Sequence, residues 1–194
     1  MDLIKERVIL ALDLEDYFAN LCKQIRNSQQ IEKLYEVERM FTAQRSSGKR
    51  LLLFGNGAAA SIASHAALDM TKQGGLVSLC FHDSALLTAF ANDYGYQNAF
   101  KEIIRAYHQE DDICVFLSVS GESPNIVEAA KFAREVGLKV IGFSGRSISN
   151  SLSQHSDVSL WVDSHAYNIV ENTHSSWLLA LVDMLLGESV YEVS

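Results

Sequence analysis

A polar turn that carries three serines is the part of this sequence most directly tied to chemistry. The turn, Ser118-Val119-Ser120-Gly121-Glu122-Ser123-Pro124, follows an apolar run at 113–117 that is typical of a buried parallel strand. An amphipathic stretch at 125–136 predicts a helix directly after it. Backbone N–H groups at a helix N-terminus lack intrahelical partners, and the helix dipole is positive there, so the turn favours an anion. Because the turn holds no Lys or Arg, hydroxyls and N–H groups would have to bind that anion, as in a pocket for a phosphorylated sugar.

A second turn, Gly55-Asn56-Gly57, follows another apolar run at 51–54. Glycine permits positive φ and lets the backbone approach a ligand closely. Ala60 stands where a dinucleotide-binding fingerprint has its third glycine, so the turn does not predict a dinucleotide site. By itself the turn is equally typical of a tight strand-to-helix connection.

Titratable side chains occur in two pairs at helical spacing. His65 and Asp69 are four residues apart, and Glu171 and His174 are three apart, so each pair shares one helix face. An imidazole beside a carboxylate can transfer protons or contribute metal ligands. Both pairs also have a plainer interpretation, as a polar helix face or as a first-turn Glu favoured by the helix dipole. A further polar stretch, Asn92-Asp93-Tyr94-Gly95, has the composition of a turn.

The elements that must position these residues alternate along the chain. Strands are predicted at 51–54, 76–81, 113–117, 140–143 and 158–162, and helices at 2–26, 29–44, 58–72, 84–91, 96–108, 125–136 and 169–186. This alternation predicts an α/β fold with a doubly wound, mostly parallel sheet flanked by helices. Ligands of such sheets bind beyond the carboxyl ends of the strands, where both turns lie.

The chain length of 194 residues predicts one domain. An N-terminal helical hairpin would occupy 1–47 and the α/β core 48–194. The first predicted helix carries apolar residues on two sides, which indicates contacts with other subunits.

Composition excludes several classes of function. The net charge of −8 argues against nucleic acid and against an anionic membrane surface as the main partner. The three cysteines are widely spaced and predict reduced thiols in a cytoplasmic protein. The N-terminus is charged rather than signal-like, and the apolar runs fall far short of the ~20 residues of a membrane span.

Four segments together resemble a SIS (sugar isomerase) domain, and within that superfamily the phosphoheptose isomerases. They are Gly55-Asn56-Gly57, Asn92-Asp93-Tyr94-Gly95, the stretch from Leu117 to Asn125, and Val140-Ile141-Gly142-Phe143-Ser144-Gly145. The resemblance covers essentially the whole chain and implies a homotetramer with pockets at subunit contacts. It implies that a phosphorylated sugar is held by the serine loop, at Ser118, Val119, Ser120 and Ser123. It implies further substrate contacts at Asn56, Gly57, Ala58, Asn92, Asp93 and Glu171.

The resemblance also implies a reaction, from the ketose sedoheptulose 7-phosphate to an aldose heptose 7-phosphate. A base moves a proton between adjacent carbons through an enediol. The implied base is Asp69, with His65 and His174 as further catalytic groups. Some members of the family bind zinc, for which the implied ligands here are His65, Asp69 and Glu171.

The sequence departs from the family pattern at several of these positions. Asp69 stands where a longer Glu is expected, Ala58 and Ala59 replace a glycine and a serine, and Val119 replaces a threonine. If Glu171 and His174 align with the last helix of the family, the catalytic histidine falls at Leu179. Two functions therefore stay open. One is an aldose–ketose isomerase, and the other is a non-catalytic SIS module that binds a sugar phosphate or a partner protein, as a replication-initiator-associating protein of the superfamily does.

Overall fold

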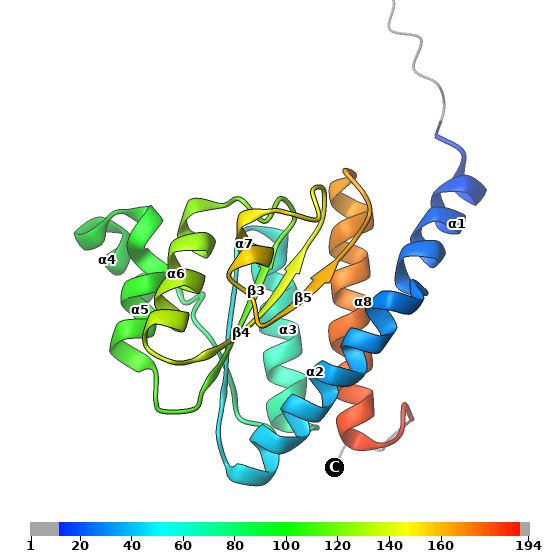
Figure 1. Ribbon diagram of the computed structural model, residues 1–194. Coiled ribbons are helices and arrows are strands. Elements are labelled where there is room, and N and C mark those ends of the chain that lie inside the picture. The colour runs from blue at the N-terminus through cyan, green and yellow to red at the C-terminus, as the bar shows by residue number, and fades with distance from the viewer. Residues whose placement is uncertain (1–11, 191–194) are drawn as a thin grey trace, which may run out of the picture.

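Five parallel strands form the central sheet in the computed structural model, which describes residues 12–190 (Figure 1). The strands are β1 Leu51–Gly55, β2 Ser78–Cys80, β3 Ile113–Ser118, β4 Lys139–Ser144 and β5 Val158–Trp161. Their spatial order is β2-β1-β3-β4-β5, and each neighbouring pair is parallel. Every residue of β1 and β3 is buried, which explains why these strands are continuous apolar runs in the sequence. The predicted α/β fold is confirmed.

Helices cover both faces of this sheet. They are α1 Leu14–Ile25, α2 Ser28–Ser47, α3 Ala58–Lys72, α4 Ser84–Tyr94, α5 Ala99–Tyr107, α6 Pro124–Glu135, α7 Ser151–Gln154 and α8 Tyr167–Leu186, with a 3-10 turn η1 at Tyr96–Asn98. Apolar side chains of α2, α3 and α8 pack in one core. Those of α5, α6 and α7 pack in a second core. The sheet therefore separates two apolar layers, as in a doubly wound fold.

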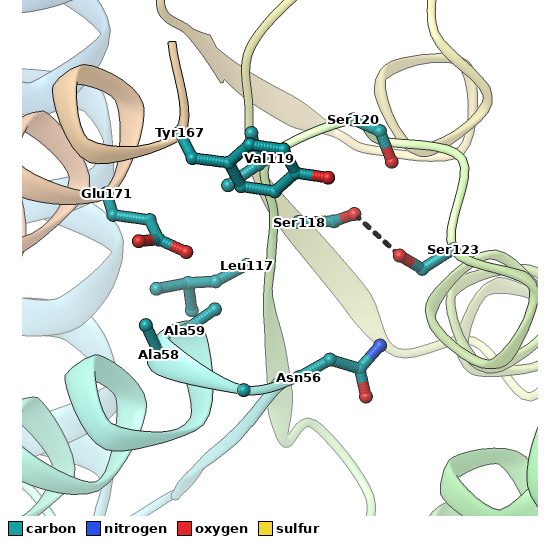
Figure 2. Close-up of a pocket in the computed structure, with 11 residues that line it drawn as sticks. Asn56, Ala58, Ala59, Leu117, Ser118, Val119, Ser120, Ser123, Tyr167 and Glu171 are labelled. Atoms are coloured by element: carbon teal, nitrogen blue, oxygen red, sulfur yellow. Dashed lines mark hydrogen bonds between the residues drawn. The ribbon is translucent and has the colours of Figure 1, made fainter. Parts of the chain in front are cut away.

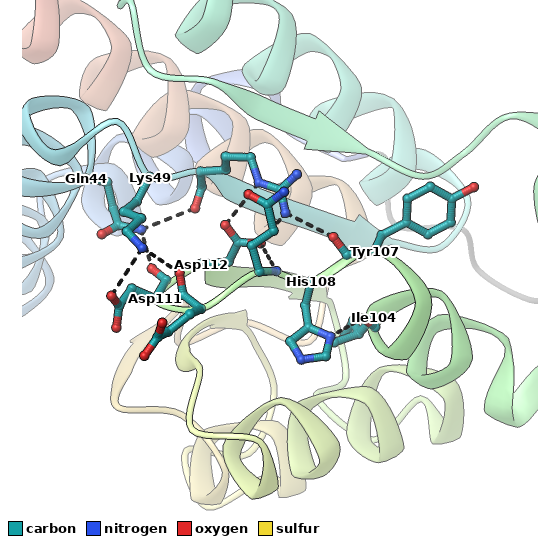
Figure 3. Close-up of polar contacts among 10 residues, drawn as sticks. Gln44, Lys49, Ile104, Tyr107, His108, Asp111 and Asp112 are labelled. Carbon is teal, nitrogen blue, oxygen red and sulfur yellow. Dashed lines mark hydrogen bonds and ion pairs between the residues drawn. The ribbon is translucent and has the colours of Figure 1, made fainter.

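The amino ends of β1 and β3 are joined by a buried polar cluster (Figure 3). The Arg50 guanidinium, just before β1, donates to both carboxylate oxygens of Asp112, at 3.1 and 2.6 Å. The Gln44 side chain of α2 donates to the Asp111 carbonyl at 2.7 Å. Asp112 is almost completely buried, so this two-point contact supplies the partner that a carboxylate in the interior requires. The cluster fixes the register of the two central strands at the edge of the sheet opposite to their turns.

Several predicted boundaries differ from the structure. Asn92, Asp93 and Tyr94 form the last turn of α4 instead of a separate turn, and Gly95, with φ of 79°, ends that helix. The apolar residues before Asn92 continue the helical pattern, so turn-forming residues alone do not end it. The short helix α7 has no counterpart in the prediction and begins where the Asn150 side chain accepts from the Ser153 N–H.

The first predicted helix, over 2–26, extends beyond the described part of the chain, so the apolar residues predicted at 3, 4, 8, 10 and 11 lie outside it. Within that part, α1 begins at Leu14, where the Asp13 side chain caps it, and Leu14 and Phe18 are exposed. Between residues 12 and 190, no helix is long and apolar enough to cross a lipid bilayer.

Candidate functional site

A cavity of about 280 Å³ lies at the carboxyl ends of β1 and β3 (Figure 2). The turn after β1, the loop after β3 and the first turns of α8 enclose it. Its lining residues are Asn56, Gly57, Ala58, Ala59, Leu117, Ser118, Val119, Ser120, Ser123, Tyr167 and Glu171. In the sheet, β2 lies on one side of β1 and β3 lies on the other. The carboxyl ends of β1 and β3 therefore form the topological switch point, where ligands of such sheets bind. Eight of the ten residues predicted to bind substrate line the cavity, namely Asn56, Gly57, Ala58, Ser118, Val119, Ser120, Ser123 and Glu171.

The serine loop presents its hydroxyls in a fixed arrangement. The Ser118 and Ser123 hydroxyl oxygens lie 3.2 Å apart, and Ser118 also accepts from the Gly121 N–H at 3.2 Å. Gly121 has a φ of 67°, and a Cβ there would collide with the Asn150 side chain, so glycine is required. Ser123 occupies the N-cap position of α6 but makes no side-chain capping bond. Its hydroxyl is therefore not used to cap the helix, and it faces the cavity (Figure 2).

The Asn56 side chain links three segments of the site. The carboxamides of Asn56 and Asn125 form two hydrogen bonds with each other, both at 2.9 Å. The Asn56 Oδ1 also accepts from the Tyr96 hydroxyl at 2.8 Å. These bonds join the turn after β1 to the start of α6 and to η1. Beside them, the His82 ring contacts the Gly55 carbonyl at 2.9 Å, and burial lowers the pKa of His82, which favours a neutral imidazole.

Asn92 and Asp93 do not line the cavity of this chain. Both are exposed at the end of α4, where the Asn92 side chain donates to Asp93 at 3.0 Å. Tyr96, shortly after that helix, contacts the cavity lining through its bond to Asn56. The predicted contacts of Asn92 and Asp93 with substrate therefore stay a prediction.

Glu171 is the one carboxylate among the lining side chains. Burial raises its pKa, because a charged carboxylate loses solvation in the cavity wall. Tyr167 lies one turn earlier on α8, and Figure 2 shows its ring above Val119 with the hydroxyl on the side of the serines. The sequence analysis missed Tyr167. Its spacing of four residues from Glu171 is the signal that could have found it.

His65 and Asp69 lie together but away from the cavity lining. The His65 Nε2 and Asp69 Oδ2 atoms are 3.1 Å apart on α3. The His65 side chain is 57% exposed and that of Asp69 is 22% exposed. The shared helix face was predicted correctly, but within this chain that face does not reach the cavity.

His174 lies in the core, which corrects its predicted place at the site. It is 1% exposed, its Nε2 lies 3.2 Å from the Ser144 carbonyl, and its ring packs against Phe143 and Trp177. Burial lowers its pKa to about 4, so the ring is neutral near pH 7. The three-residue step from Glu171 turns His174 from the cavity toward the sheet, with the other buried residues of α8.

The zinc ligands that the sequence implied are not brought together. Within residues 12–190, no group of three or more His, Cys, Asp or Glu side chains is placed to hold a metal ion. Glu171 lines the cavity, while His65 and Asp69 pair elsewhere on α3. These residues do not fit a zinc site in this chain, and no step of the reaction is assigned to a metal.

Comparison with known proteins gives consistent relationships. The family model described as SIS domain matches residues 14–145. The phosphoheptose isomerase of Aliarcobacter butzleri is 32% identical over 149 residues, which cover 74% of this chain and 78% of that protein. That of Nitratidesulfovibrio vulgaris is 32% identical over 171 residues, which cover 84% of this chain and 82% of that protein. The solved structure of phosphoheptose isomerase from Neisseria gonorrhoeae has a TM-score of 0.80 at 28% identity, covering 88% of this chain and 95% of that one.

Proposed function

The chain belongs to the SIS domain family, among the proteins named phosphoheptose isomerases, and we propose that it is an isomerase of sedoheptulose 7-phosphate. One observation carries the proposal. A single cavity holds an anion-binding turn, at the serine loop, and a carboxylate of raised pKa, Glu171. An aldose–ketose isomerase of phosphorylated sugars needs both, one to hold the phosphate and one to move the proton.

The serine loop binds the phosphate. Hydroxyls of Ser118, Ser120 and Ser123 line the cavity, and the N-terminus of α6 adds the positive end of its dipole. Because the Ser123 side chain makes no capping bond, its hydroxyl can donate to a phosphate oxygen. The sugar then extends from the phosphate into the remaining cavity, which Glu171 borders.

Glu171 moves the proton between the two carbons. Its carboxylate removes a proton from carbon 1 of the ketose while the carbonyl oxygen on carbon 2 is protonated, which gives an enediol. Return of a proton to carbon 2, with loss of the hydroxyl proton on carbon 1, gives the aldose. A raised carboxylate pKa suits this work, because the group must accept and return a proton near neutral pH. Asp69, the base implied by the sequence, pairs with His65 outside the cavity lining, so Glu171 has the stronger geometric claim.

A non-catalytic sugar-phosphate module is the second candidate, and the last helix favours it. Leu179 stands where the family resemblance places a catalytic histidine, and His174 is buried and neutral. Such a module would use the serine loop for binding but would not transfer the proton. The two candidates therefore share the phosphate site and differ in the chemistry at Glu171.

Proton exchange measured by NMR tests the proposal. The purified protein is incubated with sedoheptulose 7-phosphate in D₂O, and the protons on the carbon beside the carbonyl are followed. Exchange together with formation of the aldose would support the isomerase. Binding without exchange would support the module, and neither binding nor exchange would overturn both.

Two finer properties belong to the same proposal. The protein is a cytoplasmic homotetramer. The exposed Leu14 and Phe18 of α1 support contacts between subunits, because large apolar groups gathered on a helix surface favour burial against a partner. The three cysteines, Cys22, Cys80 and Cys114, are free, as expected in a reducing compartment. Sedimentation of the purified protein measures the subunit number directly.

A further inference from the structure

No Lys or Arg side chain lines the cavity, but one guanidinium contacts a side chain that does. Arg146 is the second residue after β4, and the N–H of the preceding Gly145 donates to the Val119 carbonyl of the serine loop at 3.0 Å. The Arg146 guanidinium carbon lies 4.9 Å from the centre of the Tyr167 ring. Tyr167 in turn lines the cavity. The Arg146 guanidinium thus contacts an aromatic ring that lines the cavity.

The backbone at Arg146 is held in a conformation that most residues avoid. Its φ is 56°, in the left-handed region where glycine is the usual residue. The Arg146 N–H donates to the Ser164 carbonyl at 3.0 Å, and its carbonyl accepts from the Trp161 indole at 3.2 Å. Unfavourable backbone geometry fixed by its surroundings is concentrated at functional sites. An arginine at a position suited to glycine indicates that its side chain is needed there.

One nitrogen of the Arg146 side chain also lacks a hydrogen-bond partner in the described part of the chain. Its Nε atom is buried and unpaired within residues 12–190. Leaving a buried N–H group without a hydrogen-bond partner costs free energy, so its presence at Arg146 calls for an explanation. Here the contact at hand is the face of Tyr167, where a cation is attracted to the ring. That contact restrains the ring whose hydroxyl points to the serine side of the cavity (Figure 2).

We propose that the Tyr167 hydroxyl binds the substrate phosphate, and that Arg146 positions Tyr167 and supplies the positive charge that selects a phosphorylated sugar. The inference rests on the proposed function, because it assigns the phosphate of that substrate to one more pair of residues. The serine loop offers only neutral donors, which bind an anion of any charge. A nearby guanidinium adds a preference for the doubly charged phosphate, because the attraction between opposite charges grows with the charge of the anion.

Substitution of both residues tests the proposal, with a matched arginine as control. Arg105 on α5 stacks on the Phe132 ring at 4.8 Å and also pairs with Glu102, so Arg105→Gln removes a charge and an aromatic contact outside the cavity lining. For Arg146→Gln we expect KM for sedoheptulose 7-phosphate to rise about tenfold, more than kcat falls, as for loss of one charge contact. Arg146→Lys should recover part of that loss, since it restores the charge. Arg105→Gln should leave KM within about twofold.

A double-mutant cycle separates positioning from packing. If Arg146 acts through the Tyr167 hydroxyl, Arg146→Gln costs less affinity in the Tyr167→Phe background than in the wild type. Arg146→Asn guards against misfolding, because asparagine tolerates the left-handed φ. It should weaken substrate binding as Arg146→Gln does, with the melting temperature preserved. Additive effects in the cycle, or equal KM values for Arg146→Gln and Arg105→Gln, would overturn the proposal.

Binding of inorganic phosphate, followed by ³¹P NMR, separates this inference from the proposed function. If the wild type converts sedoheptulose 7-phosphate and Arg146→Gln leaves both KM and phosphate affinity unchanged, only the role of Arg146 is wrong. If the wild type binds phosphate in an Arg146-dependent way but converts no sugar, only the isomerase is wrong. A wild type that binds no phosphate at millimolar concentration overturns the role of the pair.

Discussion

Glu171 and Asp69 are carboxylates on two helices that pack against each other, yet only Glu171 lines the cavity. Both helices begin at the carboxyl edge of the sheet, beside the serine loop (Figure 1). Glu171 lies four residues after the start of α8, or roughly 6 Å along its axis, whereas Asp69 lies eleven residues, or roughly 16 Å, after the start of α3. Depth along the helix therefore decides which acid can reach a ligand at this edge, and the spacing between a histidine and a carboxylate on one helix does not reveal that depth.

Among the tests of this comparison, replacement of Glu171 should have the largest effect, which is on kcat. Glu171→Gln keeps the size of the side chain and removes the base, so kcat for sedoheptulose 7-phosphate should fall by about 10²–10⁴-fold. KM should change far less, because the serine loop still holds the phosphate. Turnover is measured by NMR in D₂O. Wild-type turnover in Glu171→Gln would remove Glu171 as the base and return the role to Asp69.

His174 gives the second-largest effect, on stability rather than turnover. Its folded pKa is about 4, below the ordinary value of 6.5, so the unfolded chain binds the extra proton first. This contribution is fully present above pH 6.5 and is lost as the pH falls toward 4, by about 3 kcal/mol at most. Urea unfolding across this range measures it. His174→Gln should flatten the slope, except for a smaller part of the same sign from His82, whose pKa is also lowered.

His65 is the matched control for that experiment. Its side chain is 57% exposed, so His65→Gln removes an imidazole from the surface and leaves the buried His174 in place. His65→Gln should therefore keep the pH dependence of the wild type. An equal loss of slope in the two variants would mean that burial of His174 is not its cause.

The phosphate site gives the next effect. Ser120→Ala removes one donor to a charged ligand, so KM should rise about tenfold, with a smaller change in kcat. The exposed Ser46 of α2 provides the control, because Ser46→Ala removes a hydroxyl outside the cavity lining. An unchanged KM in Ser120→Ala would show that the serine loop does not hold the phosphate.

The sequence predicts the serine loop well because a buried strand and the following helix together fix where the loop must lie. An apolar run at 113–117 leaves the next residues, from Ser118 on, at the edge of the sheet, whatever the rest of the chain does. His174 shows the limit of this reasoning, since a step of three residues allows either the cavity face or the sheet face of α8. Only the packing of α8 on the sheet selects between them.

Arg146 and Tyr167 lie beyond such reasoning for a different reason. Arg146 follows β4, and Tyr167 begins α8, so neither stands near the serine loop in the sequence. Pairing of β3 with β4, and the bond from Gly145 to Val119, bring Arg146 beside that loop. The turn itself contains no Lys or Arg, as the sequence shows. That fact does not reveal the charged side chains that other segments bring near the folded site.

Replacement of Asp69 has the smallest expected effect and decides the comparison. Asp69→Asn alters a partly exposed contact with His65, which is worth at most about 1 kcal/mol of stability, and should lower kcat less than threefold. If kcat instead falls as far as in Glu171→Gln, Asp69 must take part in the reaction. Because it lies roughly 16 Å along α3, it would then serve the cavity of another copy of the chain. Mixed oligomers of the two single variants would then regain turnover, because each would supply the carboxylate that the other lacks. If Asp69→Asn stays near the wild type, α3 supports the site through Ala58 and Ala59 at its first turn, and its deeper face takes no part in the reaction.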